Sequence, residues 1–164
     1  MKPRTILLAA AFLLPAGMAL AQGAVPDVKT VLASADIDGL IANAKAQPAK
    51  PLIIQKIVGT GAYSANLEYR AGAAAPASIH DNENELMVFK QGTGTIVIGG
   101  TLVDGTRSNP TNQAGSSISG GKSQHVASGD VLIVPAGMAH QIVPDAGSAV
   151  VVITFHVPQP WPGK

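Results

Sequence analysis

The feature that most constrains the fold is a succession of short runs rich in Val, Ile, Leu, Thr and aromatic residues, which begins at Leu52. Glycine-containing turns separate these runs, a pattern typical of an all-β domain. Many short strands at this spacing favour a closed barrel or jelly roll, in which few strand edges stay unpaired. The predicted strands cover residues 52–58, 63–69, 77–80, 85–90, 93–98, 123–127, 131–134, 141–143 and 149–157.

One short amphipathic helix is predicted before the strands, over residues 35–46. Its apolar residues recur at helical spacing, and Ser34 or Asp36 is available as the N-cap. Pro48 and Pro51 follow the segment and exclude its continuation, because proline lacks the amide donor and disfavours helix in the residue before it. The apolar stripe, expected to pack on the barrel or on a second subunit, consists of Ile37, Leu40, Ile41 and Ala44.

Residues 104–122 interrupt the strand pattern, because they are rich in Gly, Ser, Asn and Pro. The segment is interpreted as a long loop or an irregular hairpin, with disorder as the alternative. The domain organisation expected from these patterns has an N-terminal helix and linker at 22–50, a barrel at 51–158 and a C-terminal tail at 159–164.

The first 21 residues have the three parts of a secretory signal peptide. Lys2 and Arg4 form a positive start, residues 6–14 an apolar stretch, and Ala19-Leu20-Ala21 a small-x-small cleavage site. Cleavage after Ala21 predicts a mature chain that begins at Gln22 and is periplasmic or secreted.

A membrane anchor is the alternative interpretation of the N-terminus. Pro15 and Gly17 break the apolar stretch, which also falls short of the roughly 20 residues needed to span a bilayer. Signal cleavage is therefore preferred, and no membrane span is expected in the mature chain.

Charge and cysteine usage exclude several classes of function. The chain has 11 basic and 10 acidic residues, and loss of Lys2 and Arg4 leaves 9 and 10, so the mature chain is close to neutral. Without a basic patch, a nucleic-acid partner held by phosphate neutralisation is not expected. The absence of cysteine excludes thiolate chemistry and a Cys-based zinc site.

Two stretches carry the residues with the most chemical information. In the first, His80 is followed by four residues, Glu85, six residues and Gly92. In the second, Gly129 is followed by five residues and then Pro135-Ala136-Gly137-Met138-Ala139-His140. Imidazole and carboxylate are the donors that hold Fe, Mn, Ni, Zn or Cu in a site without sulfur.

These stretches resemble the two motifs of the cupin superfamily, and the chain looks like a small exported bacterial single-domain cupin. The second motif matches at every position down to its histidine, although the usual asparagine four residues later is Pro144. The resemblance implies a double-stranded β-helix, or jelly-roll barrel, that holds one divalent transition metal. The implied ligands present here are His80, Glu85 and His140.

The first motif departs from the family pattern, because Ser78 stands where its first histidine is expected. Three interpretations stay open. The site is a two-histidine, one-carboxylate triad with open positions; or His125 or His156 completes a four-ligand set; or the barrel has lost the metal and binds an organic ligand directly. His125 and His156 are interpreted first as hydrogen-bonded polar residues, and Glu83 as part of a solvated loop that would replace Glu85 only if the register slips by two.

The resemblance implies several functions, because cupin barrels host dioxygenases, isomerases, lyases and non-catalytic binders. The first hypothesis is a metal-dependent enzyme acting on a small oxygenated metabolite, with no separate catalytic acid or base named. The second is an envelope barrel that binds a small molecule or sugar without catalysis. The third is a structural oligomer, because outward Leu86 and Val88 near a strand edge suggest a homodimer contact.

Overall fold

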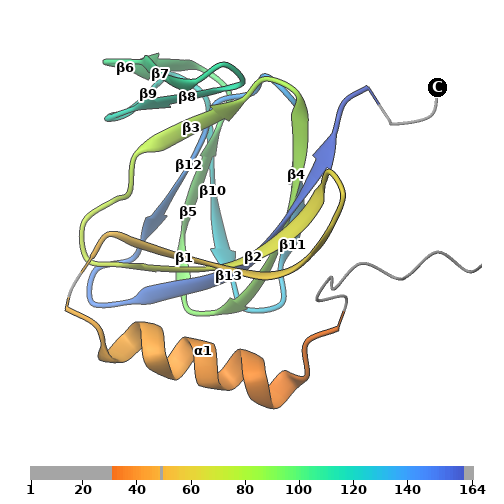
Figure 1. Cartoon of the computed structure of the whole chain (residues 1–164). Helices are drawn as coiled ribbons and strands as arrows, with labels where there is room; N and C mark the ends of the chain where they lie inside the picture. The colour runs from red at the N-terminus through yellow and green to blue at the C-terminus, as the bar shows by residue number, and fades with distance from the viewer. Residues whose placement is uncertain (1–30, 49, 161–164) are drawn as a thin grey trace, which may run out of the picture.

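The computed structural model describes residues 31–48 and 50–160 and consists mainly of antiparallel strands. Two large sheets face each other, and one helix lies below the sheet formed by β1, β2 and β13 (Figure 1). The expected signal peptide at 1–21 lies outside the described residues. Within the described residues, no helix is long and apolar enough to cross a membrane.

The first large sheet has the strand order β1-β2-β13-β4-β11. All of its neighbouring strands are antiparallel. Its members are β1 (Leu52–Thr60), β2 (Tyr63–Ala71), β4 (Glu83–Gln91), β11 (Val131–Val134) and β13 (Ala149–Pro158).

The second large sheet has the strand order β10-β5-β12-β3-β8-β7. Its members are β3 (Ala77–His80), β5 (Thr93–Ile98), β7 (Thr106–Asn109), β8 (Asn112–Gly115), β10 (Lys122–Ala127) and β12 (His140–Pro144). A separate ribbon pairs β6 (Thr101–Val103) with β9 (Ser117–Ser119). These facing antiparallel sheets form the predicted all-β jelly roll.

The segment expected to be a loop or irregular hairpin is a set of short strands. β7 and β8 form a hairpin, and β8 then pairs with β3 at the margin of the second sheet. Every residue of β7 is exposed. β8 is half-buried and has one buried residue, Gly115. Neither strand alternates apolar and polar residues, so the sequence pattern could not delimit them.

Apolar side chains from both sheets fill the space between them. The central residues are fully buried and come from strands that alternate inward apolar and outward side chains. This core comprises Met87, Phe89, Ile96, Val126, Val134, Ile142, Val150 and Val152. Met87 and Phe89, which share the strand face of Glu85, belong to this packed core.

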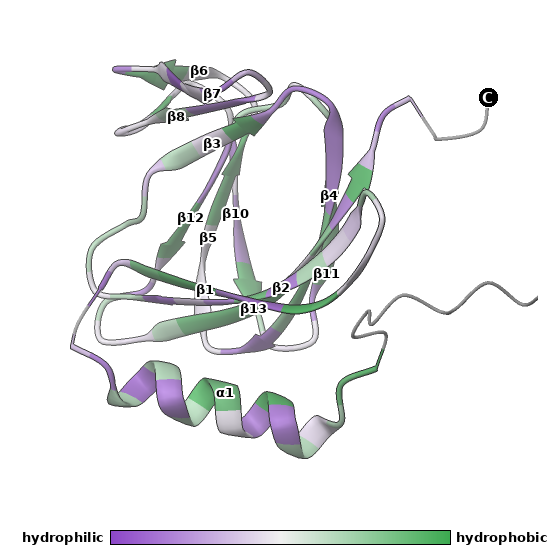
Figure 2. Ribbon diagram, viewed as in Figure 1, coloured by the Kyte–Doolittle hydropathy of each residue, from purple (hydrophilic) through white to green (hydrophobic). Residues whose placement is uncertain are grey.

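The helix α1 (Ser34–Ala46) covers the outer face of the first sheet. Ile41 and Ala44 are buried, as the apolar spacing predicts, and polar and apolar residues alternate along the ribbon in Figure 2. The prediction of Ser34 or Asp36 as N-cap was wrong, because Ala33 occupies the cap and makes no side-chain bond. Asp36 instead lies in the first turn, where its negative charge is favourable near the helix N-terminus.

A charged pair is buried on the inner face of β2. Arg70 donates to Oε2 of Glu68 from Nη2 at 2.7 Å and from Nε at 3.0 Å. The two side chains are only 8% and 6% exposed. They face inward because their ladder partners on β13, Val150 and Val152, belong to the barrel core.

We expect Glu68→Gln to lower the free energy of unfolding by about 3 kcal/mol, because it leaves the Arg70 guanidinium buried without a counter-charge. Urea denaturation measures this change. The double variant Glu68→Leu/Arg70→Met is the control: removing both charges should cost less than removing one. A double variant less stable than Glu68→Gln would contradict the expectation.

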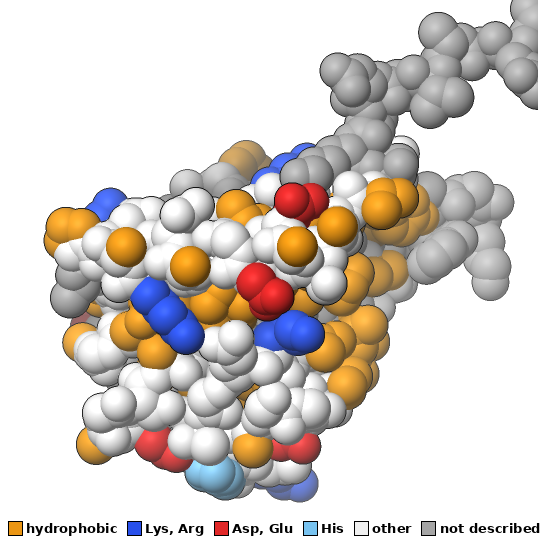
Figure 3. Space-filling model, turned by 90° about the horizontal axis from the view of Figure 1, so that it is seen from below, with side chains coloured by type: hydrophobic (Ala, Val, Ile, Leu, Met, Phe, Trp, Pro, Cys, Tyr) orange, Lys and Arg blue, Asp and Glu red, His pale blue; other side chains and the backbone are white. Residues whose placement is uncertain are grey.

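Large apolar side chains reach the surface near one edge of the first sheet. Val131 and Ile133 on the edge strand β11 are 61% and 56% exposed. They lie opposite Val88 and Leu86, which are half-buried. Seen from below, apolar side chains gather along one side of the helix-bearing face (Figure 3). The homodimer expected from Leu86 and Val88 stays a prediction.

Candidate metal centre

The structure brings His80, Glu85 and His140 together at one end of the barrel. His80 ends β3, Glu85 lies near the start of β4, and His140 begins β12. One potential ligand atom of each residue lies within 4.8 Å of one from each of the others. The three predicted site residues, which come from distant parts of the sequence, therefore converge in space.

The turn that leads into His140 is fixed by residues of the first motif. The Gly137 amide donates to the His80 carbonyl at 2.8 Å, and the Ala136 amide donates to Oδ1 of Asn84 at 2.9 Å. Gly137 has a φ of +76°, which suits glycine because it has no Cβ. This turn thus sets where the chain of β12 starts, and with it the position of the His140 ring.

Glu85 is the centre of the cluster, and its side chain is 3% exposed. Its Oε2 lies 2.9 Å from Nε2 of His140 and 3.5 Å from Nε2 of His80. Burial opposes ionisation of this carboxyl, yet the neighbouring His140 and His80 outweigh burial and hold the pKa of Glu85 well below its usual range. The lowered pKa favours the ionised carboxylate in a site almost closed to water.

The outer nitrogens of the two motif histidines are held by oxygen atoms. Nδ1 of His80 lies 2.7 Å from Oδ1 of Asn112, and Nδ1 of His140 lies 3.3 Å from the carbonyl oxygen of Met138. Because both oxygens accept, Nδ1 is the donor in each ring, and Nε2 is the ring atom that faces Glu85. This is the arrangement that metal-binding histidines use to fix their tautomer.

The charge balance of the pocket fits a cation. Oε2 of Glu85 is buried and accepts no hydrogen bond from the described residues. The Nε2 atoms of His80 and His140 lie 3.5 and 2.9 Å from this oxygen. If both rings are neutral, the nitrogen lone pairs face the oxygen lone pairs unless a proton or a cation lies between them. The residues present therefore fit a divalent transition metal, which nitrogen and oxygen donors bind.

The other two histidines differ in their surroundings. His125 on β10 is 61% exposed and lies 3.0 Å from Oδ2 of Asp145, away from the cluster. His156 on β13 is 13% exposed, and its ring centroid lies 5.1 Å from that of His80. The structure thus supports the interpretation of His125 as a hydrogen-bonded polar residue and brings His156 to the cluster.

Three residues beside the cluster were not recognised as site residues in the sequence. Glu83 and Asn84 belong to β4 and are half-buried, so the assignment of Glu83 to a solvated loop was wrong. Glu83 does not replace Glu85, because its Oε2 lies 3.0 Å from Nδ1 of His156. Only the two-residue spacing from Glu85 indicated that Glu83 would share its strand face. Asn112 lies in the segment 104–122, which has no strand periodicity, so nothing in the sequence indicated that it would bond to His80.

The fold and the site together define the class of protein. It is a barrel of two facing antiparallel sheets, with a His/Glu cluster where strand ends meet. The family model described as Cupin matches residues 42–160, so the chain belongs to the cupin family. A comparison with curated protein sequences found no match.

Solved structures share this fold at low sequence identity. The cupin domain of Schizosaccharomyces pombe Cnp3 has 12% identity and a TM-score of 0.52, covering 71% of this chain and 72% of that one. TT1209 from Thermus thermophilus has 12% identity and a TM-score of 0.51, covering 72% and 95%. A recombinant oxalate oxidase in complex with glycolate has 17% identity and a TM-score of 0.50, covering 70% and 54%. These likenesses support the cupin fold.

Proposed function

We propose that this cupin binds one divalent transition metal through His80, Glu85 and His140 and is a metal-dependent enzyme acting on a small oxygenated metabolite. The observation that carries the proposal is the buried Glu85 oxygen that accepts no hydrogen bond among the described residues and is faced by Nε2 atoms of two histidines. A mixed imidazole and carboxylate set suits Fe, Mn, Ni, Zn or Cu. The reaction would be of the dioxygenase, isomerase or lyase type.

The residues of the chain supply binding and orientation. His140 and Glu85 are the most buried members, 4% and 3% exposed, and form the inner side of the site. His80 is 19% exposed and lies nearer to solvent. A bound metal would supply Lewis-acid or dioxygen chemistry for substrate oxygens.

Metal analysis of the purified full chain tests this proposal. After chelation and gel filtration, the protein is titrated separately with Fe²⁺, Mn²⁺, Ni²⁺, Zn²⁺ and Cu²⁺, and binding is followed by calorimetry. We expect one ion per chain for at least one metal, together with a higher unfolding temperature, because a ligand that binds only the native state stabilises it. A folded protein that binds none of them would overturn the proposal.

Small carboxylic acids are suitable first ligands for the loaded protein. Oxalate and glycolate are tested because one structural neighbour is an oxalate oxidase in complex with glycolate. Turnover of a ligand supports the enzyme. Binding without turnover across dioxygenase, isomerase and lyase assays supports instead the non-catalytic barrel that receives a small molecule or sugar.

We also propose that the protein is exported. The charged start, apolar stretch and small-x-small site of residues 1–21 support a signal peptide that is removed after Ala21. We expect N-terminal sequencing of the protein expressed with its leader in a Gram-negative bacterium to begin at Gln22 in the periplasmic or secreted fraction. An intact Met1 N-terminus on cell-associated protein would contradict export.

A further inference from the structure

Ser78 occupies the strand position from which a further histidine would reach the cluster. In the ladder between β3 and β12, Ser78 lies opposite His140, and it shares a strand face with His80. A histidine at position 78 would therefore approach the centre from the second sheet, beside His140. Serine is too short to bring an imidazole nitrogen there.

His156 approaches the same centre from the first sheet. In the ladder between β13 and β4, His156 lies opposite Glu85. Its Nε2 lies 3.9 Å from Oε1 of Glu85, whereas the two motif histidines approach Oε2 of the same carboxylate. Its ring stands edge-on to the His80 ring, with an interplanar angle of 85°.

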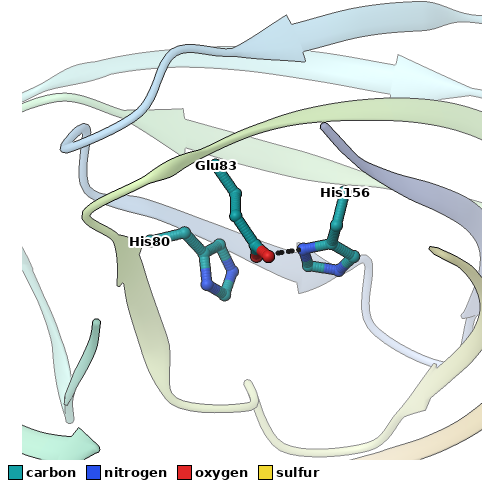
Figure 4. Close-up of side chains that lie close together, drawn as sticks. All are labelled: His80, Glu83 and His156. Atoms are coloured by element: carbon teal, nitrogen blue, oxygen red, sulfur yellow. Dashed lines mark hydrogen bonds and ion pairs between the residues drawn. The ribbon is translucent and has the colours of Figure 1, made fainter. Parts of the chain in front are cut away.

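Glu83 orients the ring of His156. Figure 4 shows the Glu83 carboxylate against the near edge of the His156 ring, with His80 beside them. Nδ1 of His156 donates to Oε2 of Glu83 at 3.0 Å. The donor role of Nδ1 leaves the lone pair on Nε2, the atom on the Glu85 side.

The three histidine rings thus share one arrangement. Nδ1 bonds to an oxygen atom in each ring: to Asn112 for His80, to Met138 for His140 and to Glu83 for His156. Nε2 of each ring lies near Glu85. A histidine that is merely hydrogen-bonded on a strand needs one partner. The second nitrogen of each ring faces the buried Glu85 carboxyl group, which is the additional feature that a ligand requires.

We propose that His156 is the fourth metal ligand, replacing the histidine absent at position 78, and that Glu83 is a positioning residue that holds His156. The inference rests on the proposed metal site and deepens it. The ligand set is then three imidazoles and one carboxylate, with its third imidazole supplied by the last strand.

A rival arrangement uses Glu83 itself as a ligand. His80, Glu83 and His156 also have potential ligand atoms within 4.8 Å of one another. All three are only half-buried, whereas Glu85 and His140 are buried. In addition, the Glu83 oxygen nearest to His156 already accepts its Nδ1 proton. The geometry therefore favours Glu85 as the carboxylate ligand and Glu83 as its outer neighbour.

The crystal structure of the zinc-loaded full chain tests the proposal without depending on a variant. We expect Nε2 of His80, His140 and His156 at about 2.0–2.1 Å from zinc, the usual Zn–N distance, and Glu83 bound only to Nδ1 of His156. Zinc coordinated by His80, Glu85 and His140 with His156 outside bonding distance would overturn this inference and leave the proposed function intact. A folded wild type that binds none of the five metals would overturn both; if it binds one of the others but not zinc, the same structure is determined with that metal.

Zinc affinities of three variants supply a second test. His156→Gln should weaken zinc binding by at least about 100-fold, and Glu83→Gln by about 10- to 100-fold, the usual effect of losing an outer partner. His125→Gln is the matched control and should bind as the wild type does, because His125 is exposed and distant from the cluster. Equal affinities of wild type and folded His156→Gln would contradict the assignment of His156.

Discussion

His140→Ala is expected to lower metal affinity by at least about 100-fold, above the loss caused by removing an outer partner. His140 supplies the nitrogen closest to the Glu85 carboxylate, at 2.9 Å, and its side chain is 4% exposed. Calorimetric titration of the chelated protein measures the change. Glu85→Gln, which keeps the shape and removes the charge, should have a comparable effect.

The control for this prediction is His125→Ala, which removes an exposed imidazole from β10. Its metal affinity and stoichiometry should equal those of the wild type. Circular dichroism establishes that each variant is folded before titration. A folded His140→Ala protein with wild-type affinity would place the metal elsewhere.

Gly92→Ala is expected to destabilise the fold by more than about 4 kcal/mol, a size reserved for specific steric or electrostatic faults. Gly92 joins β4 to β5 with a φ of +83°, and a Cβ there would overlap the carbonyl oxygen of Ala149. The obstacle is backbone of β13, which cannot move aside as a flexible side chain does. Because natural domains are stable by only about 5–15 kcal/mol, the variant should be marginally folded. Urea or thermal denaturation measures the loss.

Gly72→Ala separates the steric clash from the cost of the backbone angle. Gly72 also has a positive φ, +73°, but a Cβ there would meet no atom within 4 Å. Its substitution should cost about 1–2 kcal/mol, the penalty of the left-handed conformation alone. Equal losses in the two variants would show that contact with Ala149 is unimportant.

The sequence predicts the architecture well wherever strands have one buried face. The predicted and observed bounds of β3, β5 and β11 are identical, because apolar alternation and flanking turn residues both mark them. The motif spacing also predicted which residues meet. His80, Glu85 and His140 lie in one cluster, although only the fold brings the ends of β3 and β12 beside β4.

Residues outside the apolar pattern could not be assigned in the same way. Asn112 bonds His80 from the start of β8, a strand without apolar alternation, and Glu83 begins a strand two residues before the motif glutamate. The partner of His156 depends on the register between β13 and β4. Sequence periodicity shows which face a residue occupies, but not the residue that lies opposite. That is why His125 and His156 were equivalent before the ladder was known.

The placement of the four side chains on two different sheets has a mechanical consequence. His80 and His140 belong to the second sheet, whereas Glu85 and His156 belong to the first. A cation bound by all four would join the two halves of the sandwich at this end of the barrel. The two sheets could not then separate at this end without breaking a bond to the ion, so metal loading should slow the opening of the barrel.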